Sequence, residues 1–152
     1  MPYIIMKTMY TFIFRIIHAI QWTVNGRINV IGKENIPKNQ QFILVAPHRT
    51  WWDPLWFAIV LLPQKFIFMG KKELFKNKIF AKGLDMVGVF SVDRQNPGPS
   101  AIKIPVKELK DGTRNFMIFP SGSRHSNKAK AGAVVIAKMS GKKFCQSFTK
   151  DH

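Results

Sequence analysis

The chain of 152 residues is long enough for one globular domain, and it carries 24 Lys and Arg against 8 Asp and Glu, a formal net charge of +16. Hydrophobic residues make up 46% and aromatic residues 12% of the sequence, which excludes an intrinsically disordered polymer. The single cysteine, Cys145, excludes an intrachain disulfide, and the positive charge favours nucleic acid, anionic lipid or a phosphorylated substrate as partner.

The first 24 residues predict a helix with one polar and one apolar side. Basic residues interrupt the apolar run, so it reads neither as a membrane span nor as a secretory signal peptide. Such a helix either packs on the protein's own core or lies in a membrane interface, and the basicity of the chain favours the second interpretation. We predict an amphipathic membrane-interface helix over residues 1–26. Its polar side holds Lys7, Thr11, Arg15, His18 and Gln21, and its apolar side holds Ile5, Met9, Phe12, Ile13, Ile16 and Ile20.

Apolar runs typical of strands alternate with helical segments after residue 26. This alternation predicts one α/β domain over residues 27–140. We expect its sheet to be mixed and flanked by helices. Pro105 is expected to kink or delay the helix that contains it. Strands are predicted at 27–31, 41–47, 65–71, 86–94 and 114–120, and helices at 53–62, 72–84, 100–112 and 131–141.

Polar clusters follow three of the predicted strands: HRTWWD, DRQN and SGSRH. Ligands of α/β sheets bind beyond the carboxyl ends of the strands, so these clusters are candidates for a site. The carboxylate of Asp53 can orient His48 through one ring nitrogen, which leaves the other nitrogen to take a proton from an alcohol. The same spacing also fits a loop histidine and a helix-capping aspartate.

A metal site has little support in the sequence. The chain has four histidines and one cysteine, and neither an HExxH nor a CxxC motif is present. We therefore expect no metal and no cofactor.

Four stretches in order carry a resemblance to a known family: PHRTWWDP, MGKKELF, GVFSVDR and FPSGSRH. They resemble the His-x4-Asp block, the A-K-x-E-L segment, the G-x-I-F-I-x-R block and the F-P-E-G-T-R-S block of bacterial lysophosphatidic acid acyltransferases. This is a family of glycerolipid acyltransferases. The resemblance covers roughly residues 30–140. It implies a glycerol-3-phosphate acyltransferase-like fold.

The resemblance implies acyl transfer from acyl-CoA or acyl carrier protein to the free hydroxyl of 1-acyl-glycerol 3-phosphate, forming phosphatidic acid. His48 would be the general base, and Asp53 would orient it. The acyl thioester is then a substrate rather than a cofactor, and the enzyme would act at the cytoplasmic face of the cell membrane. The residues matched to substrate binding are Lys71, Arg94, Ser121, Gly122 and Arg124.

Two departures from the family pattern bear on activity. Ser121 stands where most members have Glu, and a serine hydroxyl supplies hydrogen bonds but no charge. Residues 141–152 read GKKFCQSFTKDH, where the family has further apolar strands. These residues predict an atypical tail on a C-terminally truncated product. The alternative function is a catalytically inactive relative that only binds anionic membrane lipid.

Nucleic acid is not an expected partner. The sequence has the charge but no RNP-type strand, zinc finger or helix-turn-helix signature. The expected partners are lysophosphatidic acid, an acyl thioester and a membrane surface, and no feature of the sequence indicates an oligomeric state.

Overall fold

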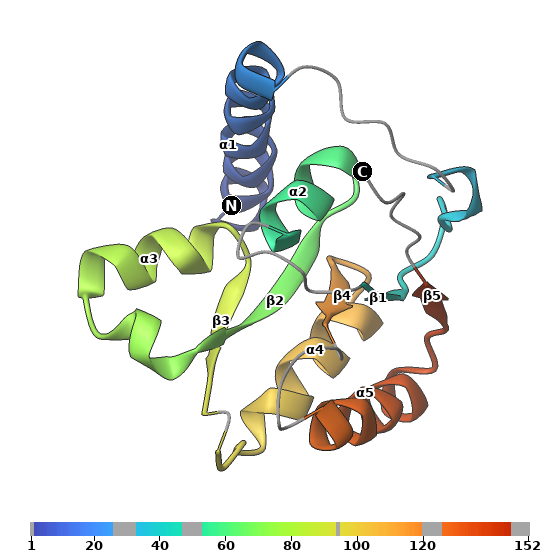
Figure 1. Cartoon of the computed structure of the whole chain (residues 1–152). Coiled ribbons are helices and arrows are strands. Elements are labelled where there is room, and N and C mark those ends of the chain that lie inside the picture. The colour runs from blue at the N-terminus through green and yellow to red at the C-terminus, as the bar shows by residue number, and fades with distance from the viewer. Residues whose placement is uncertain (1, 26–32, 47–52, 94, 120–125, 147–152) are drawn as a thin grey trace.

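The computed structural model describes residues 2–25, 33–46, 53–93, 95–119 and 126–146, which form a five-stranded sheet with helices on both faces (Figure 1). The strand order is β3-β2-β4-β1-β5. The strands are β1 (Ile43–Val45), β2 (Phe66–Lys71), β3 (Val89–Val92), β4 (Asn115–Ile118) and β5 (Phe144–Gln146). The α-helices are α1 (Pro2–Asn25), α2 (Asp53–Val60), α3 (Lys78–Met86), α4 (Ser100–Lys110) and α5 (Ser126–Ser140), and the 3-10 turns are η1 (Lys33–Asn35) and η2 (Lys72–Phe75).

Every strand pairing within the described residues is parallel, so the prediction of a mixed sheet is wrong. A helix lies between each pair of successive strands along the chain. Each of these helices carries the chain back to the end of the sheet where the previous strand began, so successive strands run in one direction. The last residues of the strands therefore lie together, at what we call the carboxyl end of the sheet. The first residues of the strands define its amino end.

Alternate residues of the central strands build two separate cores, because successive side chains of a strand point to opposite faces. Both faces are covered by helices, which explains why the strands read as continuous apolar runs. The core beneath α1 and α2 contains Phe42, Leu44, Phe66, Phe68 and Met117 (Figure 1). The core beneath α4 and α5 contains Ile43, Ile67, Phe116 and Ile118.

Helix α1 packs on the core through one side and leaves a second apolar side exposed. Tyr10 and Phe14 are each 2% exposed. The hydroxyl of Tyr10 accepts a hydrogen bond from the backbone N–H of Phe66 at 3.2 Å, and burial raises the pKa of Tyr10 to about 12. Packing of this helix on the protein's own core is thus confirmed. Four residues of the predicted apolar side are exposed instead, with exposed fractions between 41% and 63%: Met9, Phe12, Ile16 and Ile20.

The predicted helix over residues 72–84 is interrupted. Turn η2 ends at Phe75 and α3 begins at Lys78, because Asn77 caps a new helix. Its side-chain oxygen accepts hydrogen bonds from the backbone N–H groups of Ile79 and Phe80 at 2.9 and 3.1 Å. The other predicted helices and the strands of the described segments are confirmed, with bounds that differ by a few residues.

Pro105 does not delay helix α4, which begins at Ser100 and continues through the proline to Lys110. Its ring is fully buried, and this burial compensates for the missing N–H donor.

The tail at residues 141–152 contains a strand, contrary to the expectation that it has none. In β5, Cys145 lies in register with Leu44 of β1, and the Ile43 N–H donates to the carbonyl of Lys143 at 3.0 Å. The free backbone groups of β1 can pair with a short segment whose side chains are only partly apolar. The predicted strand at residues 27–31 lies outside the described residues.

A buried amide joins three strands at the amino end of the sheet. Asn115, the first residue of β4, is 2% exposed. Its side-chain oxygen accepts from the Phe42 N–H at 3.1 Å, and its nitrogen donates to the Gln64 amide oxygen at 2.8 Å. Gln64 in turn donates to the carbonyl of Pro37 at 2.9 Å. The strand starts are thereby held by side chains as well as by the backbone ladder.

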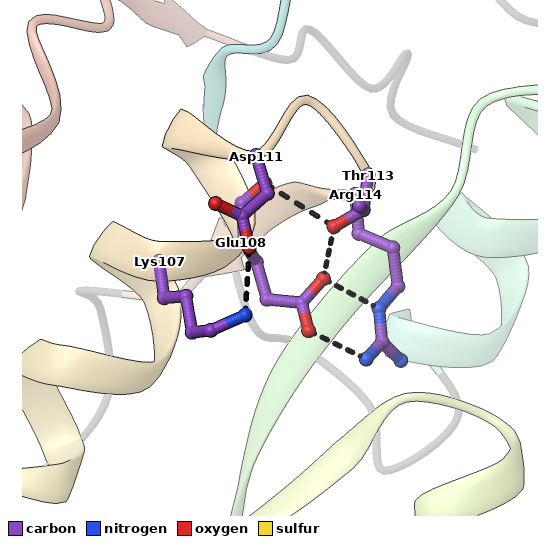
Figure 2. Close-up of polar contacts among 5 residues, drawn as sticks. All are labelled: Lys107, Glu108, Asp111, Thr113 and Arg114. Carbon is purple, nitrogen blue, oxygen red and sulfur yellow. Dashed lines mark hydrogen bonds and ion pairs between the residues drawn. The ribbon is translucent and has the colours of Figure 1, made fainter. Parts of the chain in front are cut away.

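A half-buried ion pair joins Arg114, the residue before Asn115, to Glu108 of α4 (Figure 2). Arg114 donates from Nε and Nη2 to the two carboxylate oxygens of Glu108 at 3.0 and 2.8 Å, and the Thr113 hydroxyl donates to the same carboxylate. Burial raises the pKa of Glu108, but the hydrogen bonds from Arg114 and Thr113 outweigh it, so the net shift is downward. The pair ties the end of α4 to the start of β4.

Removing the charge of Glu108 should destabilise the fold only where that carboxylate is ionised. We expect Glu108→Gln to lower the free energy of unfolding at pH 7 by about 1.5–3 kcal/mol, the range for hydrogen bonds to a charged group. Because the folded-state pKa lies below the ordinary value of 4.5, this contribution is complete above that value and is lost as pH falls through the folded-state pKa. Urea unfolding at several pH values measures the effect.

The control for this experiment is Lys107→Gln, which breaks the exposed pair with Asp111 on the same helix. Exposed pairs of this kind contribute about 0–1 kcal/mol. An equal loss of unfolding free energy in both variants would contradict the stabilising role of the ionised Glu108 carboxylate. So would a Glu108→Gln effect that persists in acid.

Replacing the buried amide should be more damaging than replacing an exposed one. Asn115→Leu leaves the Phe42 N–H and the Gln64 amide without their partner, and we expect a loss of about 2–3 kcal/mol in unfolding free energy. Gln41→Leu removes an exposed hydrogen bond to the Gly112 carbonyl and should cost less than about 1 kcal/mol. Chemical denaturation of both variants tests the order, and a reversed order would refute the role of Asn115.

Candidate functional site

The carboxyl end of the sheet brings together the strands that precede the three polar clusters. Val45 of β1 lies in register with Ile118 of β4, and the Ala46 N–H donates to the Ile118 carbonyl at 3.2 Å. Lys71 of β2 lies in register with Val92 of β3. Since β4 also pairs with β2, four neighbouring strands end at this site.

Lys71 is the last residue of β2, as in the predicted strand over residues 65–71. Its ammonium group is exposed and lies 3.8 Å from a carboxylate oxygen of Glu73. The preceding Gly70 allows close packing: a Cβ there would meet Val89 at 2.6 Å and the Phe75 ring at 3.0 Å. Glycine at this position therefore lets η2 fold against β3 directly after Lys71.

Lys72 and Asp93 link the ends of β2 and β3, a contact that motif reasoning missed. Lys72 Nζ lies 2.5 Å from Asp93 Oδ2, while Asp93 Oδ1 accepts from the backbone N–H groups of Gln95 and Asn96 at 2.9 and 3.3 Å. The hydrogen bond from Lys72, joined by the two backbone bonds, lowers the pKa of Asp93. An aspartate followed by polar residues after a strand is typical of such a turn, and this signal was present in DRQN.

Asp53 is the first residue of α2, which confirms its predicted place in the first helical turn. A carboxylate there interacts favourably with the helix dipole. The remaining predicted site residues lie outside the described residues, so their roles stay predictions. They are His48, Arg94, Ser121, Gly122 and Arg124.

No group of three or more His, Cys, Asp or Glu side chains among the described residues is placed to hold a metal ion. None of the described helices is long and apolar enough to cross a membrane.

Comparison with known proteins decides the family. The acyltransferase family model matches residues 27–145, most of the chain. The chain belongs to the acyltransferase family. The match covers β1 to β4 and all of β5 except its last residue. The strand ends described above are therefore features of an acyltransferase domain.

Three curated relatives of this chain are each named 1-acyl-sn-glycerol-3-phosphate acyltransferase. The protein of Streptococcus pneumoniae is 48% identical over 88% of this chain and 51% of its own length. The protein of Bacillus subtilis is 43% identical over 77% and 59%, and that of Borreliella burgdorferi is 29% identical over 79% and 50%. The chain thus spans about half the length of the curated relatives it matches. No solved structure shows a significant match.

The link between Lys72 and Asp93 predicts a measurable pKa. The carboxyl of Asp93 should titrate below its ordinary value of 3.8, and Lys72→Met should raise that pKa. Side-chain carboxyl NMR during an acid titration measures both. Lys107→Met, which removes the partner of Asp111 instead, is the matched control and should leave Asp93 unchanged. If Lys72→Met does not move the Asp93 titration, the ion pair is absent in solution.

Proposed function

We propose that this acyltransferase transfers an acyl chain from acyl-CoA or acyl carrier protein to the free hydroxyl of 1-acyl-glycerol 3-phosphate, forming phosphatidic acid. The proposal is supported by the family match and by the names of the curated relatives. The structural observation that best supports the proposal is the register of the strands that end at the site.

His48 follows Val45 by three residues, and Ser121 follows Ile118 by three residues. Val45 and Ile118 are register partners on adjacent strands. Three residues reach at most about 10 Å, and adjacent strands lie about 4.8 Å apart. A substrate bound beyond these two strands is therefore within reach of both the proposed base and the proposed phosphate-binding segment.

The proposed reaction needs one base and no covalent enzyme intermediate. His48 takes the proton of the substrate hydroxyl as its oxygen attacks the thioester carbonyl carbon. The carbon–sulfur bond then breaks, and the thiolate leaves with a proton returned by the histidine. Asp53, fixed at the start of α2, orients the imidazole and stabilises its charged form. Because a thioester is already activated, positioning and one base supply the required chemistry.

The substrate phosphate is assigned to the cationic groups around the same strand ends. Arg94 follows Val92, the register partner of Lys71, by two residues, so both lie within reach of one phosphate. Arg124 belongs to the segment after β4, and a guanidinium group binds phosphate oxygens in pairs. Ser121 would add a hydroxyl, and Gly122 a turn that brings backbone N–H groups close to the substrate.

A lipid substrate requires contact with a membrane, and helix α1 offers the surface for it. Its exposed apolar side, with Met9, Phe12, Ile16 and Ile20, is suited to lie in a bilayer interface at the cytoplasmic face. The large positive charge of the chain favours anionic lipid.

An acylation assay with lysophosphatidic acid tests the proposal. We expect His48→Ala to reduce kcat/KM about 100-fold or more, the usual contribution of a general base, and Asp53→Asn to reduce it less. Asp111→Asn, at the exposed end of α4, is the matched control and should leave the rate unchanged. Full activity of His48→Ala would contradict the mechanism. A chain that binds anionic vesicles without any turnover would favour the inactive lipid-binding alternative.

A further inference from the structure

The start of helix α3 exposes large apolar side chains. Ile79 is 85% exposed, Phe80 50% and Leu74 36%. All three lie within residues 74–80, which we call the α3 tip. Single exposed apolar residues are common, but an isoleucine and a phenylalanine in adjacent positions on one short helix form a patch that needs an explanation.

The α3 tip is held in a fixed conformation. The Asn77 side chain accepts hydrogen bonds from the backbone N–H groups of both Ile79 and Phe80, and the Ala81 N–H donates to the Asn77 carbonyl at 2.8 Å. A cap of this kind is worth about 1 kcal/mol to a helix start. The two apolar side chains are therefore presented by a capped helix end.

Lysines surround the α3 tip. Residues 71–82 contain Lys71, Lys72, Lys76, Lys78 and Lys82 against a single acidic residue, Glu73. The three lysines nearest to Ile79 and Phe80 in sequence, Lys76, Lys78 and Lys82, are all exposed. Apolar residues flanked by lysines suit the surface of an anionic bilayer. There the alkyl stems follow the apolar side chains and the ammonium groups meet lipid phosphates.

The position of α3 also favours a membrane. It lies beside β3 at one edge of the sheet, whereas β5, the last described strand, forms the opposite edge (Figure 1). Helix α3 contacts α1, whose own apolar side is exposed. Through η2, it follows directly after Lys71 at the carboxyl end of the sheet. A bilayer in contact with the α3 tip would therefore lie near the proposed phosphate-binding residues.

We propose that the α3 tip is a second membrane-docking element, distinct from α1, which inserts Ile79 and Phe80 into the interface of an anionic bilayer while Lys76, Lys78 and Lys82 bind lipid phosphates. The proposal deepens the proposed function, because it rests on a lipid substrate that must reach the carboxyl end of the sheet.

Vesicle co-sedimentation of the purified chain tests this docking. We expect the double variant Ile79→Ser/Phe80→Ser to bind vesicles that contain phosphatidylglycerol about tenfold more weakly or worse, since two apolar side chains lose their burial. Lys78→Gln/Lys82→Gln should weaken binding about fivefold per lysine on these vesicles and have little effect on pure phosphatidylcholine. The vesicles hold neither lysophosphatidic acid nor a thioester, so the result does not depend on acyl transfer.

The matched control is Val134→Ser/Val135→Ser, which alters two exposed apolar residues of α5 on the other face of the sheet and should leave binding unchanged. Thermal unfolding of each variant verifies that the fold is intact. Unchanged vesicle affinity of folded Ile79→Ser/Phe80→Ser overturns the proposal. So does sedimentation velocity that finds a dimer of the parent chain dissociated by this substitution, because the α3 tip would then be a contact between copies.

Discussion

The side chain of Asn115 constrains the relative positions of three strands, and the arrangement of the site depends on it. A parallel pair can slip by two residues and still present the same faces to the two cores. The Asn115 amide opposes such a slip, because it meets the Phe42 N–H before β1 and Gln64 before β2 at the same time. With the amino ends of the strands aligned in this way, Val45 and Ile118 come into register at the opposite end.

The two ends of the sheet use polar groups differently. At the amino end, buried Asn115 is hydrogen-bonded to Gln64, and Glu108 and Arg114 form a half-buried ion pair. These contacts make the strand starts rigid. At the carboxyl end, Lys71 and the pair of Lys72 with Asp93 are more exposed. Charges that remain hydrated can bind an anionic substrate without first breaking a buried contact, and the rigid amino end keeps their backbone in place.

Much of the fold was predictable because apolar runs mark strands that are buried on both faces, as in the FIFMG run of β2. Strand direction was predictable too: helices were predicted between the strands, and such crossovers favour parallel pairing, so the expected mixed sheet did not follow from the alternation. The break after Phe75 depended on one capping side chain, Asn77, and β5 formed because an open strand edge lies next to a segment of weak strand character.

For the site, the sequence placed Asp53 and Lys71 correctly at the ends of their elements. The DRQN cluster indicated the turn at Asp93, but its contact with Lys72, 21 residues away in sequence, could not be predicted because it forms only after folding.

The apolar residues of α1 form two surfaces, one packed on the core and one exposed. Tyr10 and Phe14 anchor the helix to β2 and the core, so the exposed apolar surface of α1 is fixed relative to the sheet. The α3 tip is fixed in the same sense by Asn77 and by the packing of Phe75 near Gly70. Two rigid apolar surfaces on neighbouring helices determine the orientation of a docked protein better than one, because a single helix leaves rotation about its own axis free. That fixed orientation is what the proposed acyl transfer to a bilayer lipid requires of the docked protein.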